Sequence, residues 1–501
     1  MNSPTVVIVK PGDQKRLYGA LSEFSLTAVE PPLWAALLGG YLRSHGHAVE
    51  LLDAEVEGWD GAETAARIKA LNPLLAVISV SGSNPSASTM NMIGAGHVLR
   101  NLRDIAPEIK TAIHGLHVSA LPARTMDEEH VEFAFEGEGF QALVDLVEAL
   151  QSPAPGFRIP GLWYRENGRV CANPRAPVCA DLDALPQPAW DLLPMTRYRA
   201  HNWHCFGHIQ DRQPYGVLYT SLGCPFNCSF CCINTMFGKP GIRLRSPERV
   251  IEDLDGLVTR YGIRNIKIID ELFALNEDRV IDLCDRIIER GYDLNMWAYA
   301  RVNTVTPRML ARMKKAGIHW VAYGFESANE RVLKDVDKRY DASTTMKIVD
   351  MTYQEGLYVL SNFIFGLPED DFDSMQQTLN MAMDINAEWL NIYAAVAYPG
   401  TRLHDQAIAQ GWALPASWSG YSPYARDSLP LPTRHLTAGE VLSFRDYAFH
   451  AYYENPRYLA KIQRLFGLDT VRHIQDMTRH RLQRTHRQFG EAEIPGVQTG
   501  A

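Results

Sequence analysis

The chain has 501 residues, 46% of them hydrophobic and 21% charged, with 36 glycines and 29 prolines. This is an ordinary globular composition, which excludes collagen-like, coiled-coil and disordered chains, and at about 150 residues per domain the length predicts roughly three folding units. Lys and Arg number 49 against 58 Asp and Glu, for a formal net charge of -9. That charge gives no bulk electrostatic attraction for nucleic acid or an anionic membrane, so we expect neither as a partner.

Three further features of the sequence bear on where the protein works. There is no run of about 18 apolar residues, so no membrane span is predicted, and Met1–Lys10 lacks the basic flank and long apolar run of a secretory signal. The 8 cysteines are too few for a disulfide scaffold in a chain of this length. We therefore expect a cytoplasmic protein in which clustered cysteines are candidate metal ligands.

Residues 1–150 alternate between strand-like runs and helical stripes. The strand-like runs are Val6–Val9, Ala48–Leu52, Leu74–Val80, Thr111–Ile113 and Val131–Phe135. Buried strands separated by helices predict an α/β domain with a doubly wound parallel sheet. Ligands of such sheets bind beyond the carboxyl ends of the strands, and the segments expected there are Pro11–Gln14, Ser79–Asn84, Gly115–Ser119 and Glu136–Gly139.

Residues 151–205 are predicted to form a linker. Within it, Gly161–Val170 has the pattern of a β-hairpin centred on Asn167-Gly168. Leu182–Pro194 is proline-rich and shows no clear period, which favours an extended strap. The aromatic stretch Trp203–Phe206, at the end of the linker, is a candidate lining of a substrate cavity.

Alternation resumes over residues 206–410. Six strand-like runs separated by helical patterns are found at Val217–Ser221, Asn265–Asp270, Asn295–Ala300, Trp320–Gly324, Tyr358–Phe365 and Leu390–Ala395. Six such units predict a partial (β/α)6 barrel, whose chemistry would lie at the carboxyl ends of the strands. Residues 411–501 are aromatic-rich and are predicted to form a helical C-terminal region.

Three cysteines, Cys224, Cys228 and Cys231, lie within eight residues directly after the first of these strands. Soft thiolates at this spacing suit three corners of an iron–sulfur cubane, with one iron left without a protein ligand. The alternative is a structural zinc site, which needs four ligands. Cys232 is poorly placed as the fourth because it directly follows Cys231; other candidates are His204, Cys205 and His208.

The cysteine spacing, with an aromatic residue just before the last cysteine, resembles the radical S-adenosylmethionine (SAM) superfamily. The resemblance covers about residues 210–410 and includes Ile269-Asp270-Glu271, Gly324-Phe-Glu-Ser327, Gly366-Leu-Pro368 and Tyr398-Pro-Gly-Thr401. It implies a 4Fe–4S cluster on the three cysteines, with SAM chelating the open iron. The SAM-binding residues that it implies are Phe230, Glu271, Arg301, Glu326 and Ser327. The family's usual Gly-Gly-Glu is absent around Glu271, and each of these residues taken alone also has a purely structural interpretation.

The first domain is similar to the cobalamin-binding module that precedes the barrel in class B radical SAM methylases. Glu30-Pro-Pro-Leu33, Gly115-Leu-His117 and Glu136-Gly-Glu-Gly139 carry this resemblance. The cobalamin-binding residues that we predict are Ser79, Ser81, Gly82, Gly115, His117, Glu136 and Gly137. No Asp-x-His-x-x-Gly motif follows the first strand, so the cobalt would lack a protein histidine on its lower face. The alternative is a Rossmann-like domain that binds nothing.

Together the two resemblances imply a cobalamin-dependent radical SAM methyltransferase. Its expected cofactors are a 4Fe–4S cluster, SAM and methylcobalamin, and its expected partners are a small-molecule substrate and an electron donor such as flavodoxin or ferredoxin. The most specific expectation is P-methylation of a phosphinate in phosphinothricin-type antibiotic biosynthesis. No catalytic side chain is predicted.

The same sequence features fit several other functions to different degrees. A radical SAM C-methyltransferase, cyclase or rearrangement enzyme has the same domain order. A transfer RNA methylthiotransferase is disfavoured because the sequence lacks a second N-terminal cysteine triad. A cobalamin or iron–sulfur sensor without catalysis is the alternative from another class, although the sequence contains no DNA-binding motif to support it.

Overall fold

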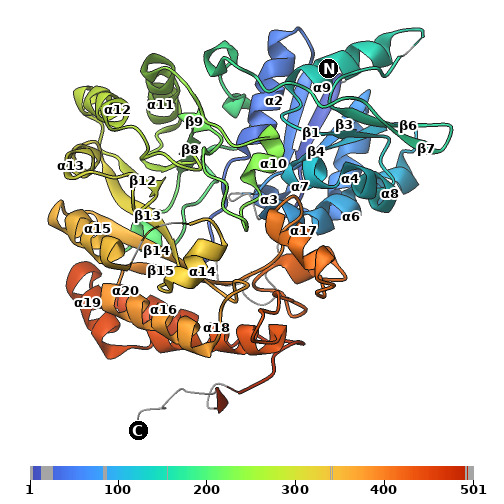
Figure 1. Ribbon diagram of the computed structural model, residues 1–501. Coiled ribbons are helices and arrows are strands. Elements are labelled where there is room, and N and C mark those ends of the chain that lie inside the picture. The colour runs from blue at the N-terminus through green and yellow to red at the C-terminus, as the bar shows by residue number, and fades with distance from the viewer. Residues whose placement is uncertain are drawn as a thin grey trace.

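The computed structural model (Figure 1) describes residues 4–12, 26–82, 87–154, 156–338, 340, 342–490 and 493–494. An N-terminal α/β domain lies on the right of the view, a partial barrel on the left, and the C-terminal helices along the bottom. Parts of two segments predicted to lie at the ligand-binding rim, Asp13–Gln14 and Ser83–Asn84, fall outside the described residues.

The N-terminal domain is built on a sheet of strand order β2-β1-β3-β4-β5-β6-β7. The first five strands run parallel in the flavodoxin-like order, which confirms the predicted doubly wound sheet. Their bounds are β1 Val6–Lys10, β2 Val49–Asp53, β3 Leu75–Val80, β4 Lys110–Gly115 and β5 Phe133–Phe135. The helices between them are α2 Leu33–Ser44, α3 Ala54–Glu57, α4 Gly61–Leu71, α5 Ala87–Met90, α6 Met92–Ile105, α7 Leu116–Ala120, α8 Pro122–Glu129 and α9 Phe140–Gln151.

The predicted hairpin is present as β6 (Leu162–Glu166) and β7 (Arg169–Ala172), which pair antiparallel. Asn167 and Gly168 both have positive φ at its turn, as a tight hairpin requires. Because β6 pairs antiparallel with β5, the hairpin extends the N-terminal sheet.

The second sheet consists of six parallel strands in the order β8-β11-β12-β13-β14-β15, which confirms the partial barrel. The strands are β8 Tyr215–Leu218, β11 Asn265–Ile268, β12 Asn295–Ala300, β13 Ile318–Glu326, β14 Tyr358–Phe365 and β15 Trp389–Ala394. A short antiparallel pair, β9 (Ser221–Leu222) with β10 (Arg243–Leu244), follows β8. The helices are α10 Ile233–Phe237, α11 Pro247–Tyr261, α12 Glu277–Arg290, α13 Pro307–Lys315, α14 Glu330–Asp335, α15 Ala342–Gln354, α16 Phe372–Ile385 and α17 Arg402–Ala409.

The local sequence explains why these helices begin and end where they do, as α11 illustrates. The Ser246 hydroxyl accepts a hydrogen bond from the Arg249 N–H at 3.3 Å, Pro247 occupies the first turn, and Gly262 ends the helix in a left-handed conformation. Apolar residues at helical spacing, including Val250 and Leu254, are buried against the barrel.

Two C-terminal helices, α18 (Ala438–Tyr453) and α19 (Pro456–Phe466), close the outer edge of β15, and α20 (Leu468–Thr478) packs against both of them. An edge strand has backbone groups without a partner strand. At Leu390 these groups are bonded by the Tyr453 hydroxyl, which donates to the Leu390 carbonyl at 2.6 Å and accepts from its N–H at 3.0 Å. Tyr452 and Tyr458 donate to the carbonyls of Ala387 and Glu388 just before the strand.

Trp203–Phe206 closes the barrel at the amino ends of its strands. The Trp203 ring meets the rings of Trp297 and Trp320 edge to face, with centroids 5.2 Å apart in each case, and Asn295, the first residue of β12, donates to the His204 carbonyl at 3.0 Å. The hypothesis that this stretch lines a substrate cavity at the carboxyl ends of the strands is therefore wrong. The large apolar rings of Trp203 and Phe206 instead fill the amino ends of the barrel strands.

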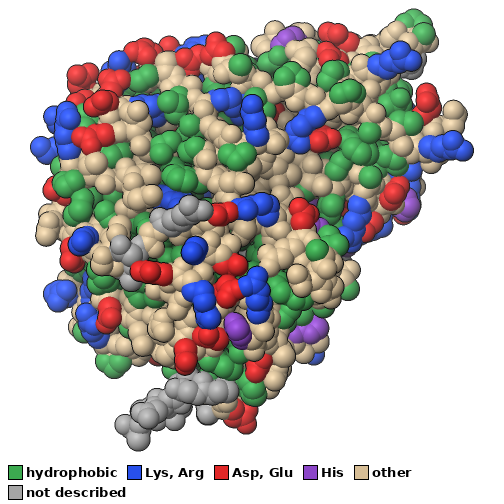
Figure 2. Space-filling view, viewed as in Figure 1, with side chains coloured by type: hydrophobic (Ala, Val, Ile, Leu, Met, Phe, Trp, Pro, Cys, Tyr) green, Lys and Arg blue, Asp and Glu red, His purple; other side chains and the backbone are tan. Residues whose placement is uncertain are grey.

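The two α/β units share one apolar core. Buried side chains form a continuous cluster from the α2 and α9 face of the N-terminal sheet, through the strap, into the barrel and the C-terminal helices. A second cluster fills the other face of the N-terminal sheet, under α4 and α6. On the face shown in Figure 2, acidic and basic side chains are interspersed. Within the described residues no helix combines the length and apolar character that a membrane crossing needs.

Candidate functional site

The cysteine motif lies in a loop whose base is closed at the carboxyl end of β8. The Gly241 N–H donates to the Cys224 carbonyl at 3.0 Å, next to the β9–β10 pair. Gly223, just before the first cysteine, has a φ of +94°, and a Cβ at this position would lie 2.4 Å from the Gly241 carbonyl oxygen. Only glycine fits there, so the entry into the loop is determined by the sequence.

Cys224, Cys228 and Cys231 are half-buried free thiols. Burial raises the pKa of the Cys224 and Cys231 thiols, and a bound cation reverses such a shift by stabilising the thiolate. Among the described residues, no three His, Cys, Asp or Glu side chains converge as ligands of one ion. A cubane places different demands on its ligands, because each thiolate binds its own iron. Three soft donors on one short loop therefore fit a cluster.

The zinc alternative loses its candidate fourth ligands. His204 and Cys205 are buried beside the amino ends of the barrel strands, where Asn265 and Asn295 contact them. The cysteine loop follows the carboxyl end of β8 instead. The segment that holds His204, Cys205 and His208 therefore lies at the wrong end of the barrel to complete a site on the loop.

Arg301 lies against the cysteine loop and stacks on Phe226, which belongs to that loop. The Arg301 Nη1 donates to the Cys228 Sγ at 3.6 Å, and its guanidinium carbon lies 4.1 Å from the centre of the Phe226 ring. Arg301 directly follows β12 and is 8% exposed. The structure thus brings this predicted SAM-binding residue to the cysteines.

Of the neighbouring carboxylates Asp270 and Glu271, only the second faces the cysteine loop. Asp270 accepts hydrogen bonds of 2.6 Å from the Thr220 N–H and hydroxyl and from the Ser221 hydroxyl, so it ties β8 to β11. Glu271 accepts from the Gly223 N–H at 3.1 Å. Burial raises the pKa of Glu271 to about 7. A cationic ligand group nearby would favour the ionised form of this carboxyl and pair with it.

Glu326 has an unusual backbone conformation and a buried partner. Its φ is +60°, at a register shift between β13 and β14, a conformation that costs a glutamate energy and that the surrounding structure must enforce. Its carboxylate forms a close ion pair with Lys338, whose ammonium lies 5.9 Å from the centre of the Phe230 ring. The cysteine loop, the end of β13 and the segment after α14 therefore meet at the predicted SAM-binding residues Phe230 and Glu326. The Ser327 hydroxyl, by contrast, hydrogen-bonds with the Thr378 hydroxyl at 3.1 Å.

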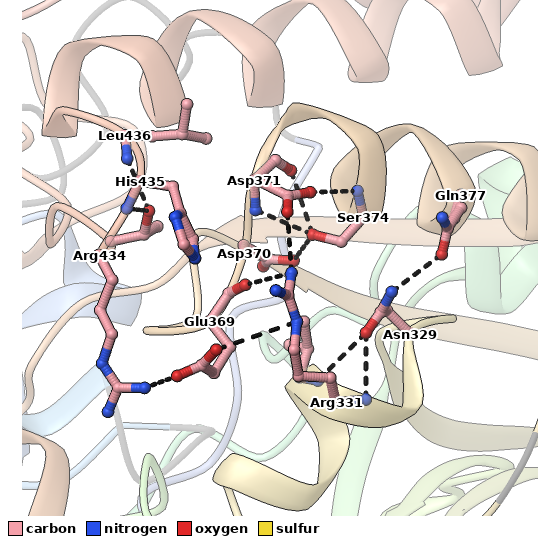
Figure 3. A network of polar contacts seen from close by, with 12 residues as sticks. Asn329, Arg331, Glu369, Asp370, Asp371, Ser374, Gln377, Arg434, His435 and Leu436 are labelled. Carbon is pink, nitrogen blue, oxygen red and sulfur yellow. Dashed lines mark hydrogen bonds and ion pairs between the residues drawn. The ribbon is translucent and has the colours of Figure 1, made fainter.

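A polar network ties the loops after β13 and β14 to the C-terminal region (Figure 3). Arg331 donates to the Glu369 carbonyl at 3.1 Å and to the Asp371 carboxylate at 2.8 Å, and Glu369 forms an ion pair with Arg434. Asn329 caps α14 and bonds to α16 through Gln377. The network buttresses the segment that carries Ser327.

Asp370, in the same network, predicts a pH dependence. Burial raises its pKa to about 7, although it accepts hydrogen bonds from Gly366, Leu367 and Ser374. A carboxyl whose pKa is raised from 3.8 stabilises the fold most at low pH. That contribution falls across the window from pH 3.8, where the unfolded chain ionises, to about pH 7, where the folded chain does, and it is absent above this window. Asp370→Asn, which does not titrate, is expected to flatten the fall of the thermal unfolding midpoint over this window. The exposed Asp373→Asn is the control, and an unchanged slope in Asp370→Asn would contradict the prediction.

The rim of the N-terminal sheet carries buried polar atoms without protein partners. Among the described residues, these include the Ser79 Oγ and the His117 Nε2. Burial lowers the pKa of His117 to about 3, so this ring is neutral. Ser81 and Gly82 are half-buried at the end of the same strand as Ser79. A large ligand with many amide groups fits such a rim, because it can supply the missing hydrogen bonds.

Two of the other predicted cobalamin-binding residues, Glu136 and Gly137, already hydrogen-bond to protein groups. Gly115 has a φ of +148° and Gly137 one of +96°, and the Gly137 N–H is bonded to the Ser119 hydroxyl at 2.9 Å. The Glu136 carboxylate is already held by Arg175 and by the Trp163 indole N–H, both at 2.9 Å.

Gly115 gives a testable prediction for the rim. A Cβ at this position would lie 2.2 Å from the Val80 carbonyl oxygen of the paired strand. Gly115→Ala should therefore cost at least about 2 kcal/mol and weaken cobalamin binding. Thermal unfolding and the absorbance of bound cobalamin would measure the two effects. Gly58→Ala is the matched control, because Gly58 also has a positive φ but nothing within 4 Å of the added Cβ; equal effects of the two variants would contradict the prediction.

The two rims meet at helices α7 and α10. The Ser119 hydroxyl of α7 lies 3.8 Å from the Met236 Sδ of α10, and the two helices lie side by side in Figure 1. Because α10 directly follows the last cysteine, the cysteine loop lies beside the carboxyl edge of the N-terminal sheet.

Comparison with known proteins agrees with this arrangement. The model of the radical SAM superfamily matches residues 218–382, and that of the B12 binding domain matches residues 24–147. An uncharacterized methyltransferase from Pyrococcus horikoshii is 33% identical over 432 residues, which cover 86% of this chain and 89% of the relative. The chain belongs to the cobalamin-binding radical SAM methyltransferase family.

More distant relatives of this methyltransferase have different named activities. The anaerobic magnesium-protoporphyrin IX monomethyl ester cyclase of Rubrivivax gelatinosus is 25% identical over 384 residues, 75% of this chain and 66% of the relative. The cytidylyl-2-hydroxyethylphosphonate methyltransferase of Streptomyces wedmorensis is 25% identical over 439 residues, 77% of this chain and 79% of the relative. The solved structure of the radical SAM methyltransferase TsrM from Kitasatospora setae, with cobalamin and a [4Fe-4S] cluster bound, shares the fold: its TM-score is 0.67 at 15% identity, over 95% of this chain and 100% of that one.

The methyltransferase accordingly uses a 4Fe–4S cluster, SAM and cobalamin. The role of each residue toward these cofactors stays a prediction. Sequence reasoning missed Lys338, Arg175 and Arg243, which contact the predicted site residues or their loops. None of these three residues belongs to a recognised motif. Their charge was the only feature of the sequence that could have drawn attention to them.

Proposed function

We propose that this methyltransferase transfers a methyl group to the phosphorus of a small phosphinate, in a pathway of the phosphinothricin type. The named substrate of the Streptomyces wedmorensis relative, a phosphonate, supports a phosphorus-containing compound. We also propose a small reducing protein such as flavodoxin or ferredoxin as the electron donor, and a cytoplasmic location.

The observation that carries the methylation chemistry is the contact between α7 and α10, which joins the cobalamin-binding rim to the cysteine loop. When bound, the cluster and SAM supply a radical that removes hydrogen from an unactivated position, and cobalamin supplies the methyl group. The protein's own contribution is orientation and exclusion of water. Arg301 covers the cysteine loop at Phe226 and Cys228, and the Glu326–Lys338 pair lies near Phe230 of the same loop.

The test is turnover of a candidate H-phosphinate by the anaerobically reconstituted enzyme with cobalamin, SAM and titanium(III) citrate. Each product should have a P–CH3 bond in place of a P–H bond, visible as loss of the large one-bond P–H coupling in phosphorus NMR. One SAM should yield 5′-deoxyadenosine and methionine and a second should yield S-adenosylhomocysteine for each methyl transferred. The matched control is the corresponding phosphonate, which has no P–H bond.

Other outcomes would replace the proposal. Methylation at carbon would remove the phosphinate as the substrate. Formation of 5′-deoxyadenosine with no S-adenosylhomocysteine would favour a cyclase or rearrangement enzyme, a possibility that the Rubrivivax gelatinosus relative keeps open. Cofactor binding without SAM cleavage would favour a sensor.

A further inference from the structure

The loop 136–139 after β5, which carries two glutamates, contacts the barrel at two places. The first contact is a buried pair between Glu138, whose side chain is 4% exposed, and Arg243 of β10, at 16%. The guanidinium donates to both carboxylate oxygens, at 2.7 and 3.1 Å. Cys179 of the linker joins the same contact, because its N–H donates to Glu138 and its carbonyl accepts from Arg243. Three parts of the chain therefore meet at one bidentate ion pair.

The second contact runs through Arg175 of the linker. Arg175 donates to the Glu136 carboxylate at 2.9 Å and to the carbonyls of Thr235 and Met236. These carbonyls belong to the last turn of α10, where backbone oxygens have no partner within the helix and a cation is favourable. Arg175 therefore links the loop after β5 to the C-terminus of α10.

Both contacts hold the ends of the cysteine loop. Arg243 pairs with Leu222 in the β9–β10 ladder, two residues before Cys224. At the other end, α10 begins directly after the cysteine motif. The cysteine loop is thus fastened on each side to one four-residue segment of the N-terminal domain.

We propose that residues 136–139, with Arg175 and Arg243, form a two-armed clamp that positions the cysteine loop against the cobalamin-binding rim. The clamp aligns the two domains so that the methyl group of SAM can pass to cobalamin. This inference rests on the proposed methylation chemistry. Glu138, Arg175 and Arg243 are positioning residues, since they act through the loop that they hold. A bidentate Arg–carboxylate pair is suited to this role because its planar geometry fixes orientation as well as distance.

Two reactions of SAM separate this role from a general structural one. Reductive cleavage takes one electron from titanium(III) citrate, breaks the S–C5′ bond and yields methionine and a radical, which takes a hydrogen atom from a C–H bond of a buffer component to give 5′-deoxyadenosine; it needs only the barrel. Titanium(III) citrate also reduces bound cobalamin to cob(I)alamin, and transfer of the SAM methyl group, as a cation, to its electron pair breaks the S–CH3 bond and yields methylcobalamin and S-adenosylhomocysteine; this reaction needs both domains. Neither reaction requires the substrate to be known.

The experiment compares Glu138→Gln, Arg175→Gln and Arg243→Lys with the parent chain. Because small misplacements of reacting groups cost up to about 10²-fold in rate, we expect S-adenosylhomocysteine formation to fall about tenfold or more while 5′-deoxyadenosine formation stays within about twofold. In the chain without cofactors, amide hydrogen exchange over residues 233–245 should become faster. Asp293→Asn is the matched control, because it removes an ion pair with Arg264 that is exposed and belongs to the barrel alone.

Several outcomes would overturn the clamp. It fails if the two products fall together, if the variants lose bound cobalamin, or if exchange over residues 233–245 is unchanged. If the parent chain forms neither product, the proposed function fails, and the exchange measurement still decides whether loop 136–139 holds the cysteine loop.

Discussion

A chain in which Cys224, Cys228 and Cys231 are all replaced by alanine is expected to purify without iron and to release no 5′-deoxyadenosine from SAM. The three thiolates are the cluster ligands that we predict on this loop, and soft sulfur donors hold such clusters. Because SAM cleavage requires the cluster, the loss should be complete. Iron analysis, the visible absorbance of the anaerobic protein and chromatography of the SAM products would measure it.

Cys232→Ser is the matched control for this triple substitution. Cys232 follows the last cysteine of the motif directly and is buried, with a pKa raised by burial to about 12. Its replacement should leave the iron content unchanged. If the triple variant retains iron, or if the Cys232 variant loses it, the cluster must be held by ligands other than the three that we predict. Zinc in the parent protein in place of iron would refute the cluster altogether.

The second large effect is expected for Glu326→Gln. The substitution leaves Lys338 as a buried cation without its partner, which in proteins typically costs about 3 to 5 kcal/mol of stability. It also removes a charged hydrogen-bond acceptor from the predicted SAM site, which corresponds to roughly ten- to hundredfold weaker SAM binding. Thermal unfolding and titration of the reconstituted protein with SAM would measure the two effects separately.

Two further variants make this result interpretable. Glu330→Gln removes an exposed carboxylate four residues away and should change neither quantity appreciably. Glu326→Gln combined with Lys338→Met removes both buried charges and should recover part of the stability without recovering SAM affinity. Recovery of SAM affinity in the double variant would mean that Glu326 serves only to pair Lys338.

The strands and the parallel class of both sheets were predictable because the apolar runs are short and regularly interrupted. Val6–Lys10 and Leu75–Val80 are buried along their whole length, as parallel strands covered on both faces must be. What the sequence pattern did not predict is that the hairpin joins the N-terminal sheet. Strand pairing depends on which edge is free, and that is a property of the folded sheet.

The site was predictable as far as motifs reach. The cysteine spacing and the segments ending at Glu271, Arg301 and Glu326 are local patterns, and the structure brings all of them to the carboxyl end of the barrel. Lys338 and the clamp arginines were not predictable, since each contacts its partner through chain folding. The Glu138–Arg243 pair, for instance, spans 105 positions. Trp203 was misplaced because an aromatic run does not reveal which end of a barrel it covers.

The way in which the C-terminal helices meet β15 has a consequence for shortened forms of the protein. Without α18 and α19, the tyrosine hydroxyls that bond Leu390, Ala387 and Glu388 would be gone. A truncated chain would then expose an unprotected strand that can recruit a second copy, and self-association into insoluble material is the expected fate of such a fragment. Attempts to isolate the catalytic half alone should therefore retain everything through Tyr458.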